Sequence, residues 1–134
     1  MKGNSHDLRR VSRTLDQFRC TDRKSSRRTS RYPMGRHVAG QLVRCGTSPA
    51  PNYEEACAAE SRADFAHKLS ICLKELRESR CWIRLIIKTE MLKEHKVSEL
   101  LEECNQLCNI IARSIVTTKR NKSAPNRSSR PSNE

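Results

Sequence analysis

Cysteines are the residues of this chain best suited to metal or covalent chemistry, and there are seven. Cys104 and Cys108 lie four positions apart, so on a helix they share one face and, with His67 or His95, would offer soft metal ligands. Both also continue an apolar repeat at helical spacing, and no CxxC or HxxxH spacing accompanies them. We therefore interpret the pair as core packing, and we predict no metal and no cofactor.

Three further cysteines, Cys45, Cys72 and Cys81, lie near histidines in the sequence and could be nucleophiles. A nucleophilic thiol needs a base and a third group that orients the base. The sequence shows neither a recognisable third residue nor an oxyanion loop beside any Cys/His pair. We interpret these cysteines as packed, reduced thiols.

Glutamates could supply paired acid/base carboxylates, and four are suitably spaced: Glu54, Glu55, Glu75 and Glu78. Lys74, Arg77 and Arg80 lie within three or four positions of the last two, as in ion pairs on a helix surface. We favour salt bridges on the helix or between subunits, and we predict that the protein is not an enzyme.

Trp82 could stack a nucleic-acid base, as aromatic side chains do in single-strand binders. Ile71 precedes Trp82 by 11 residues and Leu85 by 14. At 100° per residue, both steps return to nearly the same side of a helix. We predict that Ile71, Trp82 and Leu85 contact another helix or another subunit.

The positive charge lies at the two ends of the sequence. Residues 1–36 hold 11 basic and 3 acidic residues, residues 37–116 hold 11 of each, and residues 117–134 hold 5 basic and 1 acidic. The net charge of +12 therefore belongs to the termini, not to one face of a domain. The candidate nucleic-acid contacts follow the last predicted helix: Lys119, Arg120, Lys122, Arg127 and Arg130. An ordinary solvated terminus would have the same composition.

Two long segments show the apolar spacing of amphipathic helices, from Arg62 to about Met91 and from about Lys96 to Thr118. Ser61 precedes the first as a capping residue. The short connection predicts that the two helices are antiparallel neighbours. The core should include Cys72, Leu76, Ile83, Leu101, Cys104, Cys108 and Ile111.

Upstream, residues 36–45 and 49–60 indicate two helical pieces around a break. Gly46 is expected to end the first piece, and Ser48 followed by Pro49 is expected to cap and begin the second. The fold class is therefore all-α: an up-and-down antiparallel helical bundle with disordered basic tails. No segment approaches the ~20 apolar residues of a membrane span, so we expect a cytoplasmic protein with no membrane partner.

The stretch from about Met34 to Arg120 resembles the bacterial four-helix-bundle family known as the 23S rRNA-intervening-sequence protein. The resemblance rests on ordered pieces: the R-x-G-T-S turn at Arg44 to Ser48, Asn52-x-x-Glu55-Ala56, Asp64-Phe65, Glu75 and Glu78 before Trp82, and the LLEEC run that ends at Cys104. It implies an up-and-down bundle in a ring-shaped homo-oligomer, a pentamer, with no catalytic residues. Similar accessory proteins bind a reverse transcriptase and nucleic acid through a basic surface, which implies RNA or a nucleoprotein as partner.

The sequence departs from the family where the first amphipathic helix of the bundle should stand. Residues 17–33 show no apolar stripe, whereas the standard code permits a nucleotide string for them whose next frame reads NFAVRIVKVVDALPDT, which has one. We hypothesise that this segment is translated out of frame. The predicted organisation is a basic segment over 1–33, disordered or out of frame, a helical domain over 34–120 and a disordered basic tail over 121–134.

Two functions remain open from the sequence. One is a homo-oligomeric accessory or scaffold protein whose basic C-terminal edge engages RNA or a nucleoprotein. The alternative is a purely structural bundle, or the decayed product of a selfish element, with no ligand.

Overall fold

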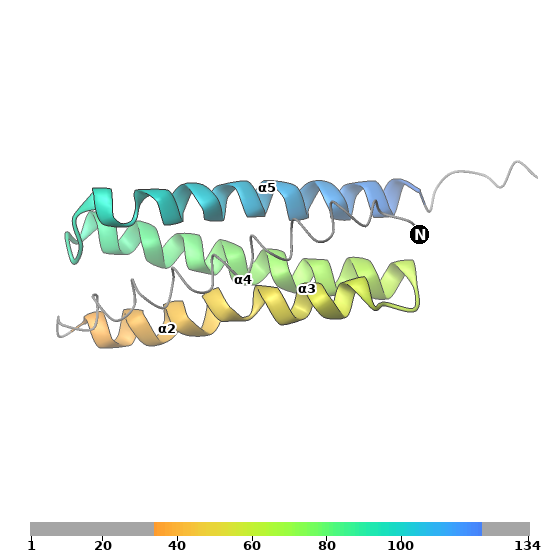
Figure 1. Ribbon diagram of the computed structural model, residues 1–134, viewed down its shortest axis with the longest axis horizontal. Coiled ribbons are helices and arrows are strands. Elements are labelled where there is room, and N and C mark those ends of the chain that lie inside the picture. The colour runs from red at the N-terminus through yellow and green to blue at the C-terminus, as the bar shows by residue number, and fades with distance from the viewer. Residues whose placement is uncertain (1–33, 122–134) are drawn as a thin grey trace, which may run out of the picture.

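A computed structural model describes residues 34–121, which are all-α and contain no strand. Helices α2 (Gly35–Thr47) and α3 (Pro49–Cys57) form one bent rod. Helix α4 (Arg62–Lys88) returns alongside it, and α5 (Ser98–Arg120) runs back along α4 (Figure 1). A short 3-10 turn, η1 (Glu94–Lys96), lies between α4 and α5. The predictions made for residues 1–33 and 122–134 fall outside the described residues.

The bend between α2 and α3 is a kink in a nearly continuous helix. Gly46 does not end the first piece as predicted, because α2 continues to Thr47 and Ser48 keeps helical dihedrals of −69° and −35°. Pro49 has no N–H to continue the hydrogen-bond ladder, which bends the rod at this point. Nor does the Ser48 side chain cap α3. Its Oγ and its carbonyl oxygen instead accept hydrogen bonds from Asn52 Nδ2, at 3.1 and 2.9 Å.

The start of α4 is the predicted one. Ser61 is extended, and its Oγ accepts a hydrogen bond from the backbone N–H of Asp64 at 3.0 Å. This bond satisfies one of the backbone donors that a helix start leaves without a partner. The carboxylate of Asp64 also lies in the first turn, where the helix dipole favours a negative charge.

The end of α4 comes three residues before the predicted one. Glu90 has a φ of +55°, and the N–H groups of Glu90 and Met91 donate to the carbonyls of Ile87 and Ile86, both at 3.1 Å. This is the Schellman arrangement, which reverses the chain at a residue in the left-handed region. Met91 therefore folds back into the core instead of extending the helix.

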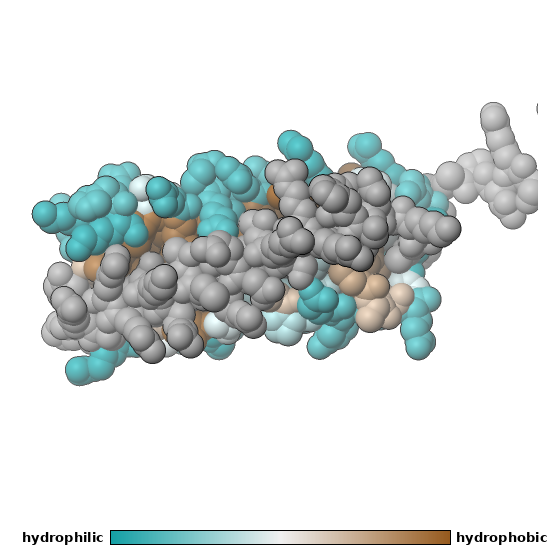
Figure 2. Space-filling view, viewed as in Figure 1, coloured by the Kyte–Doolittle hydropathy of each residue, from teal (hydrophilic) through white to brown (hydrophobic). Residues whose placement is uncertain are grey.

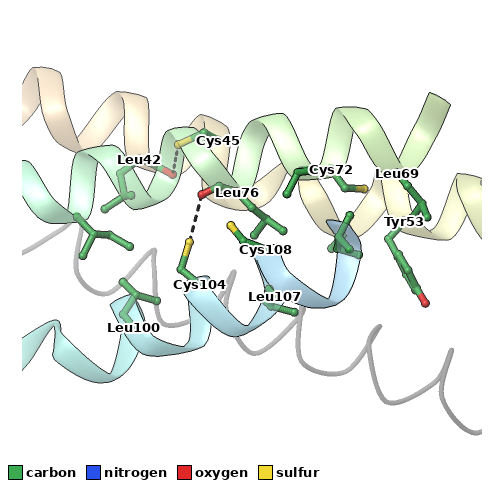
Figure 3. Packing of buried hydrophobic residues seen from close by; sticks show 14 of the residues in the cluster. Leu42, Cys45, Tyr53, Leu69, Cys72, Leu76, Leu100, Cys104, Leu107 and Cys108 are labelled. Carbon is green, nitrogen blue, oxygen red and sulfur yellow. Dashed lines mark hydrogen bonds between the residues drawn. The ribbon is translucent and has the colours of Figure 1, made fainter. Parts of the chain in front are cut away.

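The core lies where α4 packs against α5 on one side and against α2 and α3 on the other. Figure 3 shows part of it, with Leu76, Leu100 and Leu107 directed between the helices. Six of the seven predicted core residues are buried, but Leu101 is only half-buried and Leu100 takes the central position. Helix α5 presents Leu100, Cys104, Leu107 and Ile111 to α4, which leaves Leu101 on the flank of this stripe.

Candidate functional site

The buried cysteines join helices through their thiols. Cys104 Sγ on α5 donates to the carbonyl oxygen of Leu76 on α4 at 3.2 Å, a hydrogen bond drawn in Figure 3. Cys72 Sγ donates to the carbonyl oxygen of Pro49 at 3.3 Å, and the Ser79 hydroxyl donates to Cys45 Sγ at 3.1 Å. These thiols act as small core residues that also satisfy neighbouring polar atoms.

The acid-base state of Cys72 and Cys104 opposes a nucleophilic role, whereas the pKa of Cys108 is lowered by its hydrogen bond with Cys104 but the Cys108 thiol is buried. Burial raises the pKa of Cys72 to about 12. A hydrogen bond with the Cys108 thiol, followed by burial, raises the pKa of Cys104. A nucleophilic cysteine needs a lowered pKa and access to solvent. Cys81 is exposed, unlike Cys45 and Cys72, so the three candidates do not share one environment.

The candidate metal ligands do not form a cluster among the described residues. Nowhere in residues 34–121 do three or more His, Cys, Asp or Glu side chains gather in a way that could hold an ion. Cys104 and Cys108 are buried in the α4–α5 contact, whereas His67 and His95 are exposed. The four residues therefore do not converge on one site.

Two of the four candidate carboxylates meet an arginine that the sequence reasoning did not select. Arg44 on α2 donates from Nη1 to Glu75 Oε2 at 3.2 Å and from Nη2 to Glu78 Oε1. The ion pairs therefore join two helices, whereas the predicted partners lie on α4 itself. A hydrogen bond from Arg44 holds the pKa of Glu78 below its ordinary value. Such a carboxylate is ionised and engaged, so it is a poor general acid.

The other two glutamates lie on α3. Glu55 pairs with Lys68 of α4, which ties the end of the bent rod to the start of the long helix. Glu54 is exposed on the same helix. The ion pairs of Glu55 and of Arg44 both lie between helices, so these salt bridges link α3 and α2 to α4.

The stripe predicted for a subunit contact is partly used inside the chain. Trp82 Nε1 donates to Glu78 Oε1 at 3.4 Å, and its ring meets His37 of α2 edge to face, with ring centroids 5.9 Å apart. Trp82 and Leu85 are half-buried against the core, and Ile71 is half-buried nearer the start of α4. A contact of these residues with another subunit stays a prediction.

Basic side chains gather where α4 begins and α5 ends. Lys119 and Arg120 form the exposed last turn of α5, while Lys122, Arg127 and Arg130 lie outside the described residues. Arg62 Nη1 donates to the carbonyl oxygen of Asn121 at 2.9 Å. Arg62 is not among the predicted contacts, although the predicted antiparallel pairing of the two helices places the start of one beside the end of the other. We define the basic edge as Arg62, Lys119 and Arg120.

Comparison with known proteins identifies the family. The family model described as the 23S rRNA-intervening sequence protein matches residues 28–113, more than half of the chain. The chain belongs to this family. A solved structure from Bacteroides thetaiotaomicron, described as a protein with unknown function from the S23 ribosomal protein family, is 28% identical. The match covers 78% of this chain and 97% of that one, with a TM-score of 0.74. No curated protein matches the chain.

The family resemblance gains a physical meaning from the structure. Arg44 comes from the R-x-G-T-S piece, Glu75 and Glu78 from the acidic pair, and Trp82 follows them. These separate pieces meet in one polar cluster where α2 packs against α4. Their spacing therefore reflects the packing of two helices, and neither match assigns them a catalytic role.

None of the helices within residues 34–121 is long and apolar enough to cross a membrane.

Proposed function

We propose that this protein is a non-enzymatic, homo-oligomeric scaffold that binds RNA through the basic edge. The observation that carries the proposal is the separation of charge. Residues 37–116 are neutral overall, while Lys119 and Arg120 are exposed at the end of α5 and further basic residues follow them. Exposed cations that follow a rigid helix can track a phosphate backbone, and their affinity for it does not depend on base sequence.

The non-enzymatic part of the proposal draws support from the candidate chemical groups. Cys45, Cys72 and Cys104 are buried and hydrogen-bonded. Glu75 and Glu78 are engaged by Arg44. None of the six described cysteines forms a disulfide, which fits a reducing compartment such as the cytoplasm.

Self-association draws support from apolar side chains that the described helices leave open to solvent. Ile110 and Val116 on α5 are 41% and 48% exposed, and Ile71 on α4 is half-buried. A domain of roughly 90 residues buries a small core, so burial between subunits would add stability. By family resemblance the assembly is a pentameric ring, and a ring would bring several basic edges together on one rim.

The test is the affinity for a single-stranded RNA, measured by fluorescence anisotropy across a range of salt concentrations. We expect the affinity to fall steeply with salt. We also expect the plot of log affinity against log salt to be less steep for K119A/R120A/K122A, with the magnitude of its slope smaller by about 2. Each phosphate that is no longer neutralised removes roughly 0.7 from this magnitude. The matched control removes three positive charges at the other end of the α4–α5 pair, with K88A/K93A/K96A, and should retain the slope.

Other results would reject the proposal. Binding that is absent, or that does not respond to salt, favours a structural bundle with no ligand. An equal effect of the two triple variants would show that net charge, not the basic edge, sets the affinity. Absence of RNA binding together with capture of a purified reverse transcriptase would favour a nucleoprotein partner instead.

A further inference from the structure

A cavity of about 300 Å³ opens beside the basic edge, between the first turns of α4 and the last turn of α5. Its walls are formed by Arg62, Ala63, Ala66 and His67 of α4 and by Thr118 and Lys119 of α5. Two of the lining residues, Ala63 and Ala66, have short side chains, which leave room beside the longer lining side chains. The family match assigns no role to it.

The cavity combines an apolar floor with cationic walls. Ala63 and Ala66 are the apolar lining residues, and Arg62 and Lys119 are the cationic ones. Arg62 is held in place by its bond to the carbonyl oxygen of Asn121 at 2.9 Å. A guanidinium has five N–H donors, so this bond leaves most of them available for a phosphate.

Hydroxyl groups add acceptors to the walls. Ser70 and Thr118 donate their hydroxyl hydrogens to carbonyl oxygens of their own helices, Ser70 to Ala66 at 2.8 Å and Thr118 to Ser114 at 2.8 Å. Both residues line the cavity, and each hydroxyl oxygen keeps lone pairs that can accept a further hydrogen bond. The exposed imidazole of His67 presents a flat ring on the same wall. Acceptors and a flat ring suit the ribose and base of a nucleotide better than a bare anion.

We propose that this cavity holds one nucleotide unit of single-stranded RNA, with the phosphate on Arg62 and Lys119 and the ribose and base over Ala63 and Ala66. This inference rests on the proposed function, because it gives the basic edge a specific point of contact. The volume falls at the lower end of the range of small-ligand sites, ~300–1,000 Å³, and therefore suits one nucleotide rather than a duplex.

The test fills the cavity without changing the charge. Ala63 is exposed, so A63L adds bulk to the floor while the helix keeps a good helix former. We expect A63L to weaken binding of the single-stranded RNA by roughly tenfold, the lower part of the range for loss of one stacked base. The salt slope should stay as in the unchanged protein, because the phosphate-binding cations are all kept. The control A58L adds the same bulk at an exposed position at the end of α3.

The outcomes separate the two proposals. If A63L binds RNA as tightly as the unchanged protein while K119A/R120A/K122A still loses affinity, the nucleotide site is wrong and the basic edge stands. If A63L and A58L weaken binding equally, the nucleotide site is also wrong. If the unchanged protein binds no RNA, both proposals fail. Equal thermal unfolding midpoints of A63L and the unchanged protein would exclude misfolding as the cause of a loss.

Discussion

At the scale of single residues, the sequence reveals the types of the chemical groups but not their partners. Cys104 and Cys108 continue an apolar stripe, and the structure confirms that both are buried. Glu75 and Glu78 are recognisable as ion-pairing residues, but Arg44 lies 31 and 34 positions away, so no rule for neighbours on one helix could select it. Only the packing of α2 against α4 brings these groups together.

From the Arg44 ion pair we predict a pH-dependent contribution to stability. Because the pKa of Glu78 is lowered in the folded protein, the contribution is fully present above the ordinary glutamate value of 4.5 and disappears as the pH falls through the lower folded value. We expect R44A to lower the free energy of unfolding at pH 7 and to approach the unchanged protein at pH 3. Urea unfolding at the two pH values measures the difference.

The matched control for this prediction is R36A, which removes an exposed arginine from the same helix. We expect R36A to change stability less than R44A at pH 7 and to show no such convergence at low pH. A difference between R44A and the unchanged protein that is the same at pH 7 and pH 3 would contradict the ion-pair account.

At the scale of elements, periodicity predicts the helices, and local backbone chemistry sets their ends. The Ser61 cap is predictable because a hydroxyl three residues before an acidic residue is a recognisable signal. The end of α4 cannot be predicted from the sequence, because the left-handed residue is Glu90 and not the glycine that usually occupies this position. Pro49 predicts an interruption between the two helical pieces. Ser48 has helical dihedrals, however, so the chain bends there without a complete break.

Glu90 offers a direct test of the account of the α4 end. A side chain in the left-handed region costs roughly 1–2 kcal/mol, whereas glycine adopts it freely but loses more backbone entropy on folding. We expect E90G to raise the free energy of unfolding by up to about 1 kcal/mol. Thermal or urea unfolding measures the change.

The control for E90G is E94G, in the 3-10 turn that follows. Glu94 does not have a positive φ, because Glu90 alone among the described non-glycine residues has one. E94G gains no relief of strain and should be neutral or destabilising. A loss of stability in E90G as large as that in E94G would show that the reversal after α4 does not depend on the left-handed residue.

At the scale of the whole molecule, α4 is the central rod. Its two sides pack against α5 and against α2 and α3, while no comparable packing joins α5 to α2 or α3 among the described helices. Figure 2 shows hydrophobic residues on the viewed face between hydrophilic outer edges. A four-helix bundle places its fourth helix across such a pair of outer rods. The sequence predicts that the helices are antiparallel. It does not predict that nearly all of the packing between helices involves α4.

The hypothesis of out-of-frame translation predicts a gain of stability on repair. We expect a variant in which NFAVRIVKVVDALPDT replaces residues 17–33 to unfold at a higher temperature, because an amphipathic helix would bury apolar surface at about 25 cal/mol per Å². Each kcal/mol gained adds roughly 4–8 °C for a domain of this size. Differential scanning calorimetry measures the shift.

The control for the repaired variant carries the same residues in shuffled order, which keeps the composition but removes the apolar stripe. An unchanged midpoint in the repaired variant, or an equal rise with the shuffled segment, would reject the hypothesis. The nucleotide sequence of the gene is an independent check, since the codons for residues 17–33 must themselves spell an amphipathic helix in another frame.

The central claim is that RNA lies along the basic edge, where α4 begins and α5 ends. The most direct measurement is photo-crosslinking of a 4-thiouridine-containing single-stranded RNA to the full chain, followed by mass spectrometry of the crosslinked peptides. We predict crosslinks in the peptides that carry residues 62–67 and 117–120, and none in the peptides that carry η1 at the other end of the molecule. Crosslinks spread evenly over both ends, or confined to the η1 end, would contradict the claim.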